Sequence, residues 1–323
     1  MTKSKTRWWR LIAGLLGLTL IAGACGGGDD TGAGAGGEGG DLSGSIAIDG
    51  SSTVAPLSEA IAEEFRAEAS NVNVSVGTSG TGGGFKKFCA DEIEIADASR
   101  PIKQEEIDDC KAKGVEFTEF RVGLDGLAVV TSAKNKFLEC LSFAQLQAIW
   151  KDGGASTWNQ VDPKFPNAKV AIFAPGADSG TYDFFNEEIL GDLKKPETPK
   201  PRADYTASEN DNAIVQGIEG EENSWGYFGY AYYQENKQGL KDVKVSEEEG
   251  GECVEPTAET IESGDYPLSR PLFIYVNNKA LDRPEVKEFV RFYLETTPEL
   301  IEEIGYVAAP AKDYEDGLAK LDA

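Results

Sequence analysis

Three segments rich in serine, threonine and glycine have the character of an anion-binding site. Each follows a strand-like run and leads into a helix-like pattern; they are Gly50–Pro56 (GSSTVAP), Gly77–Phe85 (GTSGTGGGF) and Asp178–Tyr182 (DSGTY). This arrangement directs hydroxyl and free backbone N–H groups toward one point, and a helix N-terminus adds a partial positive charge there. The chemistry that these residues suggest is the binding of a dehydrated anion through hydrogen bonds.

Each segment alone also has a simpler interpretation. Ser52, Thr53 or Ser179 would then only cap the helix that follows, and Gly82–Gly84 would form a turn. The glycine-rich segment is not a Walker A loop, because no Gly-Lys-Ser/Thr follows it, and it is not a dinucleotide-binding fingerprint. The convergence of several such segments favours anion binding, and the candidate donors are Ser52, Thr53, Thr81, Ser179, Gly180 and Thr181.

A fourth segment, Ala96–Pro101 (ADASRP), carries charge. Arg100 can form a charge-assisted, bidentate contact with an oxyanion. The alternation along residues 92–98 predicts a strand that places Asp97 and Ser99 on the same face. Asp97 would orient the arginine or accept a proton from the ligand, and the alternative is a surface ion pair without a role in binding.

The residue types argue against common enzyme active sites. The chain contains no histidine, which removes Ser-His and Cys-His nucleophile pairs and all imidazole metal sites. Ser179 also lies one place too late in Gly176–Gly180 for the G-x-S-x-G nucleophile elbow. We therefore expect no catalytic residue, no metal and no cofactor.

The elements that must position the donor segments alternate along the chain. Strand-like runs and amphipathic helical patterns follow one another from Ser45 to Leu294, which is typical of an α/β protein. The net charge is −25, and it becomes −29 if residues 1–24 are removed, because these carry four positive side chains and no negative ones. Such an acidic chain argues against nucleic acid as a partner.

The first residues are interpreted as an export signal. Four basic residues precede the apolar run Leu11–Ala22, whose 12 residues are too few for a membrane span of about 20. Ala22–Cys25 (AGAC) resembles a bacterial lipobox, so residues 1–24 are a predicted signal peptide and Cys25 the predicted lipid attachment site. The glycine-rich, acidic residues 25–42 are predicted to form a flexible tether. The alternative is a plain secreted protein that is cut nearby.

Four further cysteines suggest disulfides, because an even number in an exported chain is typical of disulfide bonding. None of their spacings resembles a zinc site. Three pairings are possible. We favour Cys89–Cys110, which closes a local loop, together with Cys140–Cys253, which joins distant segments.

The ordered set of motifs resembles a known family. GSSTVAPL, SGTGGGFKKF, ADASRPI, FAPGADSGTYDFF, GYFGYAYY and YPLSRPLFIYVN follow one another between Gly50 and Asn277. The set is similar to that of the phosphate-binding proteins of the bacterial phosphate ABC importer (PstS type). The resemblance implies an α/β, two-lobed type II periplasmic-binding-protein fold, with the ligand in the cleft between the lobes.

The resemblance also implies a set of phosphate contacts. By motif, the family's donors fall on Ser52, Thr53, Thr81, Ser179, Gly180 and Thr181. Ser99 lies where some relatives place an aspartate that accepts the proton of hydrogen phosphate, and Pro175 lies where they carry an arginine. We infer that Ser99 and Arg100 contact phosphate, that Arg100 supplies the positive charge, and that Asp97 or Asp178 is the proton acceptor. A carboxylate facing the ligand would accept a hydrogen bond from hydrogen phosphate and repel sulfate.

The positions of the binding motifs predict the lobe boundaries. Lobe one is expected to comprise residues 43–122 and 272–323, and lobe two residues 123–271, so that the chain crosses twice between them. The resemblance implies a lipid-anchored, extracytoplasmic monomer that captures inorganic phosphate for the permease subunits of an ABC importer. The alternatives are the same fold with another oxyanion (sulfate, molybdate or arsenate), a secreted phosphohydrolase, or a surface sensor that does not transport.

Overall fold

The structure, a computed structural model, describes residues 42–177, 179–193 and 195–322. The predicted signal peptide, Cys25 and Asp178 lie outside the described residues. Strands and helices alternate along the chain, as the sequence predicts. The strands are β1 (Ser43–Gly50), β2 (Asn71–Gly77), β3 (Ile95–Ala98), β4 (Phe117–Ser132), β5 (Cys140–Ser142), β6 (Ala171–Ala174), β7 (Thr206–Ala207), β8 (Ser224–Gly229), β9 (Leu240–Asp242), β10 (Lys244–Ser246) and β11 (Ser269–Asn277).

Helices separate most of the described strands. They are α1 (Ala55–Glu68), α2 (Thr81–Cys89), α3 (Gln104–Ala112), α4 (Phe143–Trp150), α5 (Gly180–Ile189), α6 (Asp211–Gly220), α7 (Tyr230–Glu235), α8 (Ala258–Ser263), α9 (Asn278–Leu281), α10 (Pro284–Ile304) and α11 (Ala311–Leu321), with two short 3-10 turns. Helix α10 shows why these segments are helical. Pro284 lies in its first turn, Val286, Phe289 and Tyr293 form one buried stripe, and Gly305 ends it in a left-handed conformation.

The described strands form one nine-stranded sheet and one two-stranded sheet. In the larger sheet the order is β2-β1-β3-β11-β4-β8-β6-β7, with β9 paired to β4. Strands β2, β1 and β3 are parallel to one another, and so are β8, β6 and β7. The two groups are joined by the antiparallel strands β11 and β4. Two parallel units are therefore connected by one antiparallel pair at the centre of the sheet.

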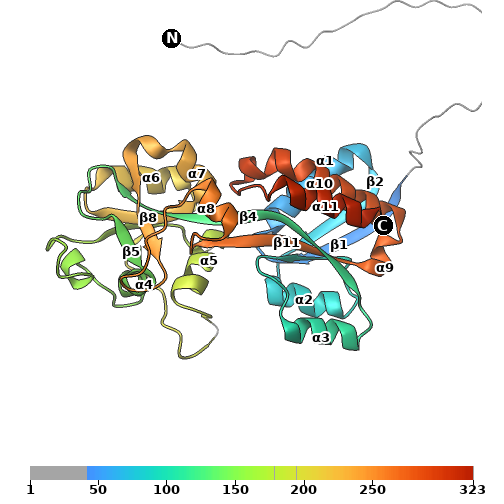
Figure 1. Ribbon diagram of the computed structural model, residues 1–323, viewed down its shortest axis with the longest axis horizontal. Coiled ribbons are helices and arrows are strands. Elements are labelled where there is room, and N and C mark those ends of the chain that lie inside the picture. Colours follow the sequence, from blue (N-terminus) through green and yellow to red (C-terminus); the bar gives the residue numbers. More distant parts are fainter. Residues whose placement is uncertain (1–41, 178, 194, 323) are drawn as a thin grey trace, which may run out of the picture. The chain divides into compact units, whose positions relative to one another are not determined.

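Helices cover the two parts of the sheet separately. Around β1 to β3, helices α1, α10 and α11 lie on one side of the sheet, and α2 and α3 lie on the other (Figure 1). Helices α4, α5, α6, α7 and α8 gather around the part that contains β8 (Figure 1). Among the described strands, only β4 and β11 run from one group to the other (Figure 1), as expected of a two-lobed protein whose chain crosses twice.

The crossing strands pair close to the predicted lobe boundaries. Gly123 lies opposite Leu272, and the regular pairing of β11 with β4 is interrupted between Leu272 and Phe273. The boundaries predicted at residues 122/123 and 271/272 therefore fall at cross-strand neighbours next to this irregularity. The sequence pattern indicates β4 only over Gly126–Thr131, because the polar residues of its first half interrupt the apolar run.

Both favoured disulfides are present. Cys89 at the end of α2 is bonded to Cys110 of α3, and Cys140 at the start of β5 is bonded to Cys253. The first disulfide lies in a second, smaller hydrophobic cluster with Phe85, Phe88 and Tyr275. The prediction of both pairings is confirmed.

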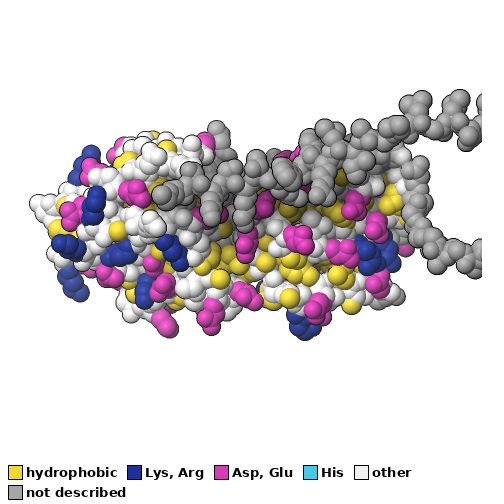
Figure 2. Space-filling model, turned by 90° about the horizontal axis from the view of Figure 1, so that it is seen from above, with side chains coloured by type: hydrophobic (Ala, Val, Ile, Leu, Met, Phe, Trp, Pro, Cys, Tyr) yellow, Lys and Arg dark blue, Asp and Glu magenta, His cyan; other side chains and the backbone are white. Residues whose placement is uncertain are grey.

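The surface of the described residues is acidic. Figure 2 shows Asp and Glu side chains spread along the length of the visible face. The acidic loop Glu247–Glu252 is exposed. None of the helices in the described part of the chain is both long and apolar enough to cross a membrane.

Candidate functional site

Backbone hydrogen bonds hold the loop after β1 against the neighbouring segments. The backbone N–H of Ser51 donates to the carbonyl of Asp97 on β3 (2.9 Å), and that of Gly80 donates to the carbonyl of Gly50 (2.8 Å). Gly50 has a φ of +148°, and a Cβ there would collide with the carbonyl of Asp97. The loop therefore depends on a glycine at position 50, which lets β1 and β3 approach closely.

Neither Ser52 nor Thr53 caps the helix that follows. The N-cap of α1 is Val54, and no side chain accepts a hydrogen bond there. The Oγ of Ser51 accepts from the N–H of Thr53 (3.2 Å), whereas Ser52 is exposed and Thr53 is buried. The simpler capping interpretation of this segment is therefore not what the structure has.

The glycine-rich segment brings Thr81 against Ser99. The hydroxyl of Thr81 accepts from the N–H of Ser99 (3.2 Å) and lies 3.3 Å from its Oγ. Asp49 fixes the same segment, because its carboxylate accepts from Ser79 and pairs with Lys87. Burial opposes ionisation of Asp49, but the contacts with Lys87 and Ser79 hold its pKa below the usual value. Two of the predicted donors, Thr81 and Ser99, therefore lie side by side.

The N-terminus of α5 reaches the loop after β1. Ser179 caps this helix, since its Oγ accepts from the N–H of Thr181 (3.2 Å). A Cβ on Gly180 would lie only 3.5 Å from the hydroxyl oxygen of Thr53. The first turn of α5, with its free backbone N–H groups and partial positive charge, thus lies next to Thr53.

A cleft of about 900 Å³ lies beside this point. Ser52, Thr53, Thr81, Ser99 and Arg100 line it, whereas Ser179, Gly180 and Thr181 do not. Of these three, Gly180 lies next to Thr53. The charged lining residues are Lys86, Arg100, Lys103, Arg270, Glu105, Glu106, Asp109, Asp183, Glu187, Glu188 and Asp192. Carboxylates outnumber cations, so an anion must be attracted by local donors rather than by the net charge of the walls.

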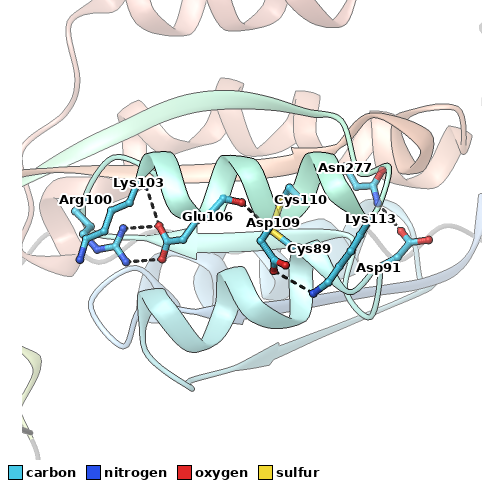
Figure 3. Close-up of a disulfide and its surroundings, with 9 residues drawn as sticks. All are labelled: Cys89, Asp91, Arg100, Lys103, Glu106, Asp109, Cys110, Lys113 and Asn277. Carbon is cyan, nitrogen blue, oxygen red and sulfur yellow. Dashed lines mark hydrogen bonds and ion pairs between the residues drawn. A yellow bond between two sulfur atoms is a disulfide. The ribbon is translucent and has the colours of Figure 1, made fainter.

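Arg100 is held by a carboxylate at the rim of the cleft. Its two terminal nitrogens donate to both carboxylate oxygens of Glu106 on α3 (2.9 and 2.8 Å; Figure 3). Its guanidinium also lies over the ring of Phe85. Burial opposes ionisation of Glu106, but hydrogen bonds from Arg100 and Lys103 hold the pKa of Glu106 below its usual value.

A second arginine, Arg270, was not among the predicted donors, and its side chain is more buried than that of Arg100. Arg270 of β11 donates to Asp125 of β4 through Nε (3.2 Å) and Nη2 (3.1 Å). Nη2 also donates to the hydroxyl of Thr53 (2.6 Å). The Arg270 side chain is 10% exposed and lines the cleft. The sequence feature that could have indicated Arg270 is its position at the start of an apolar strand, within the motif YPLSRPLFIYVN.

The structure does not bring the carboxylate of Asp97 to the cleft. Asp97 is fully buried, and both of its carboxylate oxygens accept from the hydroxyl of Ser58, which also contacts the hydroxyl of Tyr293. Strand β3 ends at Ala98, so Ser99 turns toward the cleft while Asp97 faces α1 and α10. The predicted common face of Asp97 and Ser99 is therefore wrong. Burial raises the pKa of Asp97 to about 8.

Comparisons with known proteins agree on one family. Residues 35–297 match the family model for the PBP superfamily domain. The chain is 43% identical over 321 residues to the phosphate-binding protein PstS of Staphylococcus aureus (strain USA300), covering 98% of this chain and 93% of that protein. It is 47% identical over 273 residues to protein SphX of Synechococcus elongatus, covering 83% and 79%.

A solved structure shows the same fold. The crystal structure of a protein from Planctomyces limnophilus DSM 3776, described as a possible phosphate binding protein, superposes with a TM-score of 0.83 at 48% identity. The match covers 87% of this chain and 98% of that one. The two-lobed arrangement predicted for the chain is thereby confirmed.

Proposed function

The chain belongs to the PstS-type phosphate-binding proteins of the PBP superfamily, and we propose that it captures inorganic phosphate outside the cytoplasm for an ABC importer. The observation that carries this proposal is that three kinds of donor lie close to one another beside the cleft. The hydroxyl of Thr53, the first turn of α5 and the guanidinium of Arg270 lie together there. Their chemistry fits an oxyanion, which loses water on entry and needs charged and neutral donors in exchange.

Binding between the two parts of the molecule accounts for capture and release. Thr53, Thr81 and Ser99 follow strands of the β1–β3 part, whereas Ser179–Thr181 follow β6. An anion held by donors from both parts favours the closed arrangement. Docking on the permease subunits would then open the cleft and release the anion. The family is one of transport receptors rather than of enzymes, and we assign no catalytic residue.

Selectivity for phosphate over sulfate requires an acceptor for the proton of hydrogen phosphate. Asp97 is turned away from the cleft, so we assign this role to Asp178, which adjoins the N-cap of α5 in the sequence. A carboxylate there accepts a hydrogen bond from hydrogen phosphate and repels sulfate, which has no proton to give near neutral pH. Asp178→Asn is therefore expected to weaken discrimination against sulfate, while Asp97→Asn leaves it unchanged.

Isothermal titration calorimetry tests the proposed function. The purified protein is titrated with phosphate and, separately, with sulfate, molybdate and arsenate. We expect saturable binding of one phosphate per chain and at least about 100-fold weaker binding of sulfate, a difference of about 2.7 kcal/mol. Absence of phosphate binding, or equal affinity for sulfate, would reject phosphate capture.

The placement of the protein follows from its N-terminal segment. We propose that residues 1–24 are removed on export, that Cys25 is lipidated, and that residues 25–42 tether the folded part to the membrane as a monomer. Cys25→Ser should move the protein from the membrane fraction to the medium or periplasm. We also propose lobes of residues 43–122 with 272–323 and of residues 123–271; the pairing of Gly123 with Leu272 supports these boundaries.

A further inference from the structure

Arg270 is placed by the pairing of the two crossing strands. Arg270 on β11 lies directly opposite Asp125 on β4 in the antiparallel ladder, and the two side chains form an ion pair. Asp125 is buried, and its carboxylate does not line the cleft, whereas Arg270 does. The carboxylate therefore holds the guanidinium from behind and leaves its other edge toward the cleft.

The same guanidinium contacts elements on both sides of the cleft. Nη2 donates to the hydroxyl of Thr53 in the loop after β1. The guanidinium carbon lies 3.8 Å from the centre of the Phe184 ring on α5. Such stacking fixes the plane of an arginine, so its donors have a set direction. Arg270 thus joins the crossing strands, the first donor loop and the helix that carries the second donor loop.

The donors of Arg270 are not all used. Among the described residues, Nη1 has no hydrogen-bond partner, whereas both terminal nitrogens of Arg100 donate to Glu106. An arginine presents five N–H groups, and leaving some of them unpaired in a largely buried position is costly unless a ligand or water takes them. The guanidinium of Arg270 contacts the hydroxyl of Thr53, which also lies next to Gly180 in the first turn of α5, and Arg270 lines the cleft.

We propose that Arg270 is the cation that contacts the bound anion and that Asp125 is its positioning residue, an inference that rests on the proposed capture of phosphate. Arg270 then replaces the arginine expected at position 175, where this chain has proline. A phosphate oxygen accepts from Nη1, and Asp125 keeps the guanidinium in the plane that makes this contact possible. Because Arg270 belongs to a crossing strand, anion binding acts directly on the segment that connects the two lobes.

The test is calorimetry with phosphate on wild type, Arg270→Gln and Arg270→Lys. We expect Arg270→Gln to lower the affinity on the order of 100-fold, because a charge-assisted contact in a desolvated site is lost. Arg270→Lys should restore part of this loss, since it keeps the charge but not the bidentate geometry. The affinity of Arg270→Gln should also depend less on ionic strength than that of wild type.

A matched control lies on β4, the crossing strand that pairs with β11. Arg121 of β4 is paired with Asp313 of α11, lies opposite Phe273 of β11 and does not line the cleft. Arg121→Gln should keep wild-type affinity for phosphate. Asp125→Asn serves if Arg270→Gln does not fold, because its amide oxygen still accepts from Arg270; we expect about a fivefold to tenfold loss of affinity, from a guanidinium that is held less firmly.

The outcomes separate the two proposals. If wild type binds phosphate and the affinity of Arg270→Gln or Asp125→Asn is within twofold of the wild-type value, this inference is overturned and the proposed function stays intact. Wild type that binds no phosphate overturns the proposed function and this inference with it. Loss of thermal stability in the two variants with unchanged affinity would show that the Arg270–Asp125 pair serves the fold alone, which also overturns the inference.

Discussion

Two arginines that line the cleft, Arg270 and Arg100, are each paired with a carboxylate, Asp125 and Glu106 respectively, but the two pairs differ in position and burial. Arg100 and Glu106 are six residues apart and meet at the rim, with side chains 27% and 16% exposed. Arg270 and Asp125 come from distant parts of the chain and meet at the crossing strands, with side chains 10% and 6% exposed. The two arginines therefore differ in burial and in their partners, because Arg270 also contacts Thr53 and Phe184.

The largest expected difference between the pairs is in stability. Asp125→Ala leaves Arg270 largely buried without its carboxylate, which should cost about 3 to 5 kcal/mol of unfolding free energy. Glu106→Ala exposes a rim arginine to water and should cost about 1 kcal/mol or less. Urea unfolding of both variants, followed by circular dichroism, measures the two values. Equal losses would contradict the distinction between a deep and a rim pair.

Asp97 sharpens the comparison, because it is a buried carboxylate with no arginine beside it. Its pKa is raised to about 8 by burial, so the folded state keeps a proton that the unfolded state releases at about pH 4. The unfolding free energy of wild type should therefore fall relative to Asp97→Asn as the pH rises between these values. From pH 5 to pH 7 the change is about 2 to 3 kcal/mol.

Unfolding of wild type and Asp97→Asn at both pH values provides the measurement. The asparagine does not titrate and still accepts from Ser58, so the two curves should converge at low pH. If the unfolding free energies of wild type and Asp97→Asn change in parallel from pH 5 to pH 7, Asp97 is already ionised in the folded protein. That result would contradict the expectation that a buried carboxylate without an arginine partner keeps its proton.

The smallest expected effect is on binding at the rim. Arg100→Gln should weaken phosphate binding less than about fivefold, or about 1 kcal/mol, because both terminal nitrogens of Arg100 already donate to Glu106. Calorimetry on this variant beside Arg270→Gln gives the ratio directly. If Arg100→Gln has the greater loss, the ranking of the two pairs is reversed and the cation inferred from the sequence motif is the right one.

Most of the fold could be predicted from the sequence, because it depends on local patterns. The stripe of Leu57, Ile61 and Phe65 predicts α1, and Pro284 with the apolar residues after it predicts α10. The pairing of Cys89 with Cys110 follows from a short loop between two cysteines. The residues that determine each of these features lie within a few helical turns or a few tens of residues of one another.

Candidate donors could be predicted from the sequence only where they follow their own strand. Thr53, Thr81 and Ser99 each follow a strand, and all three line the cleft. The orientation of Asp97 was missed because β3 ends at Ala98, which alternation alone does not reveal. The pairing of Arg270 with Asp125 could not be predicted, because the two residues are 145 positions apart and strand register of this kind is not visible in either segment.

The most direct measurement of the central claim is a crystal structure of the purified protein with phosphate. The account predicts one phosphate whose oxygens lie within about 3 Å of the Thr53 hydroxyl, an Arg270 terminal nitrogen and a backbone N–H in the first turn of α5. A phosphate bound instead against Arg100 and Lys103 at the rim, with the Arg270–Asp125 pair untouched, would contradict it.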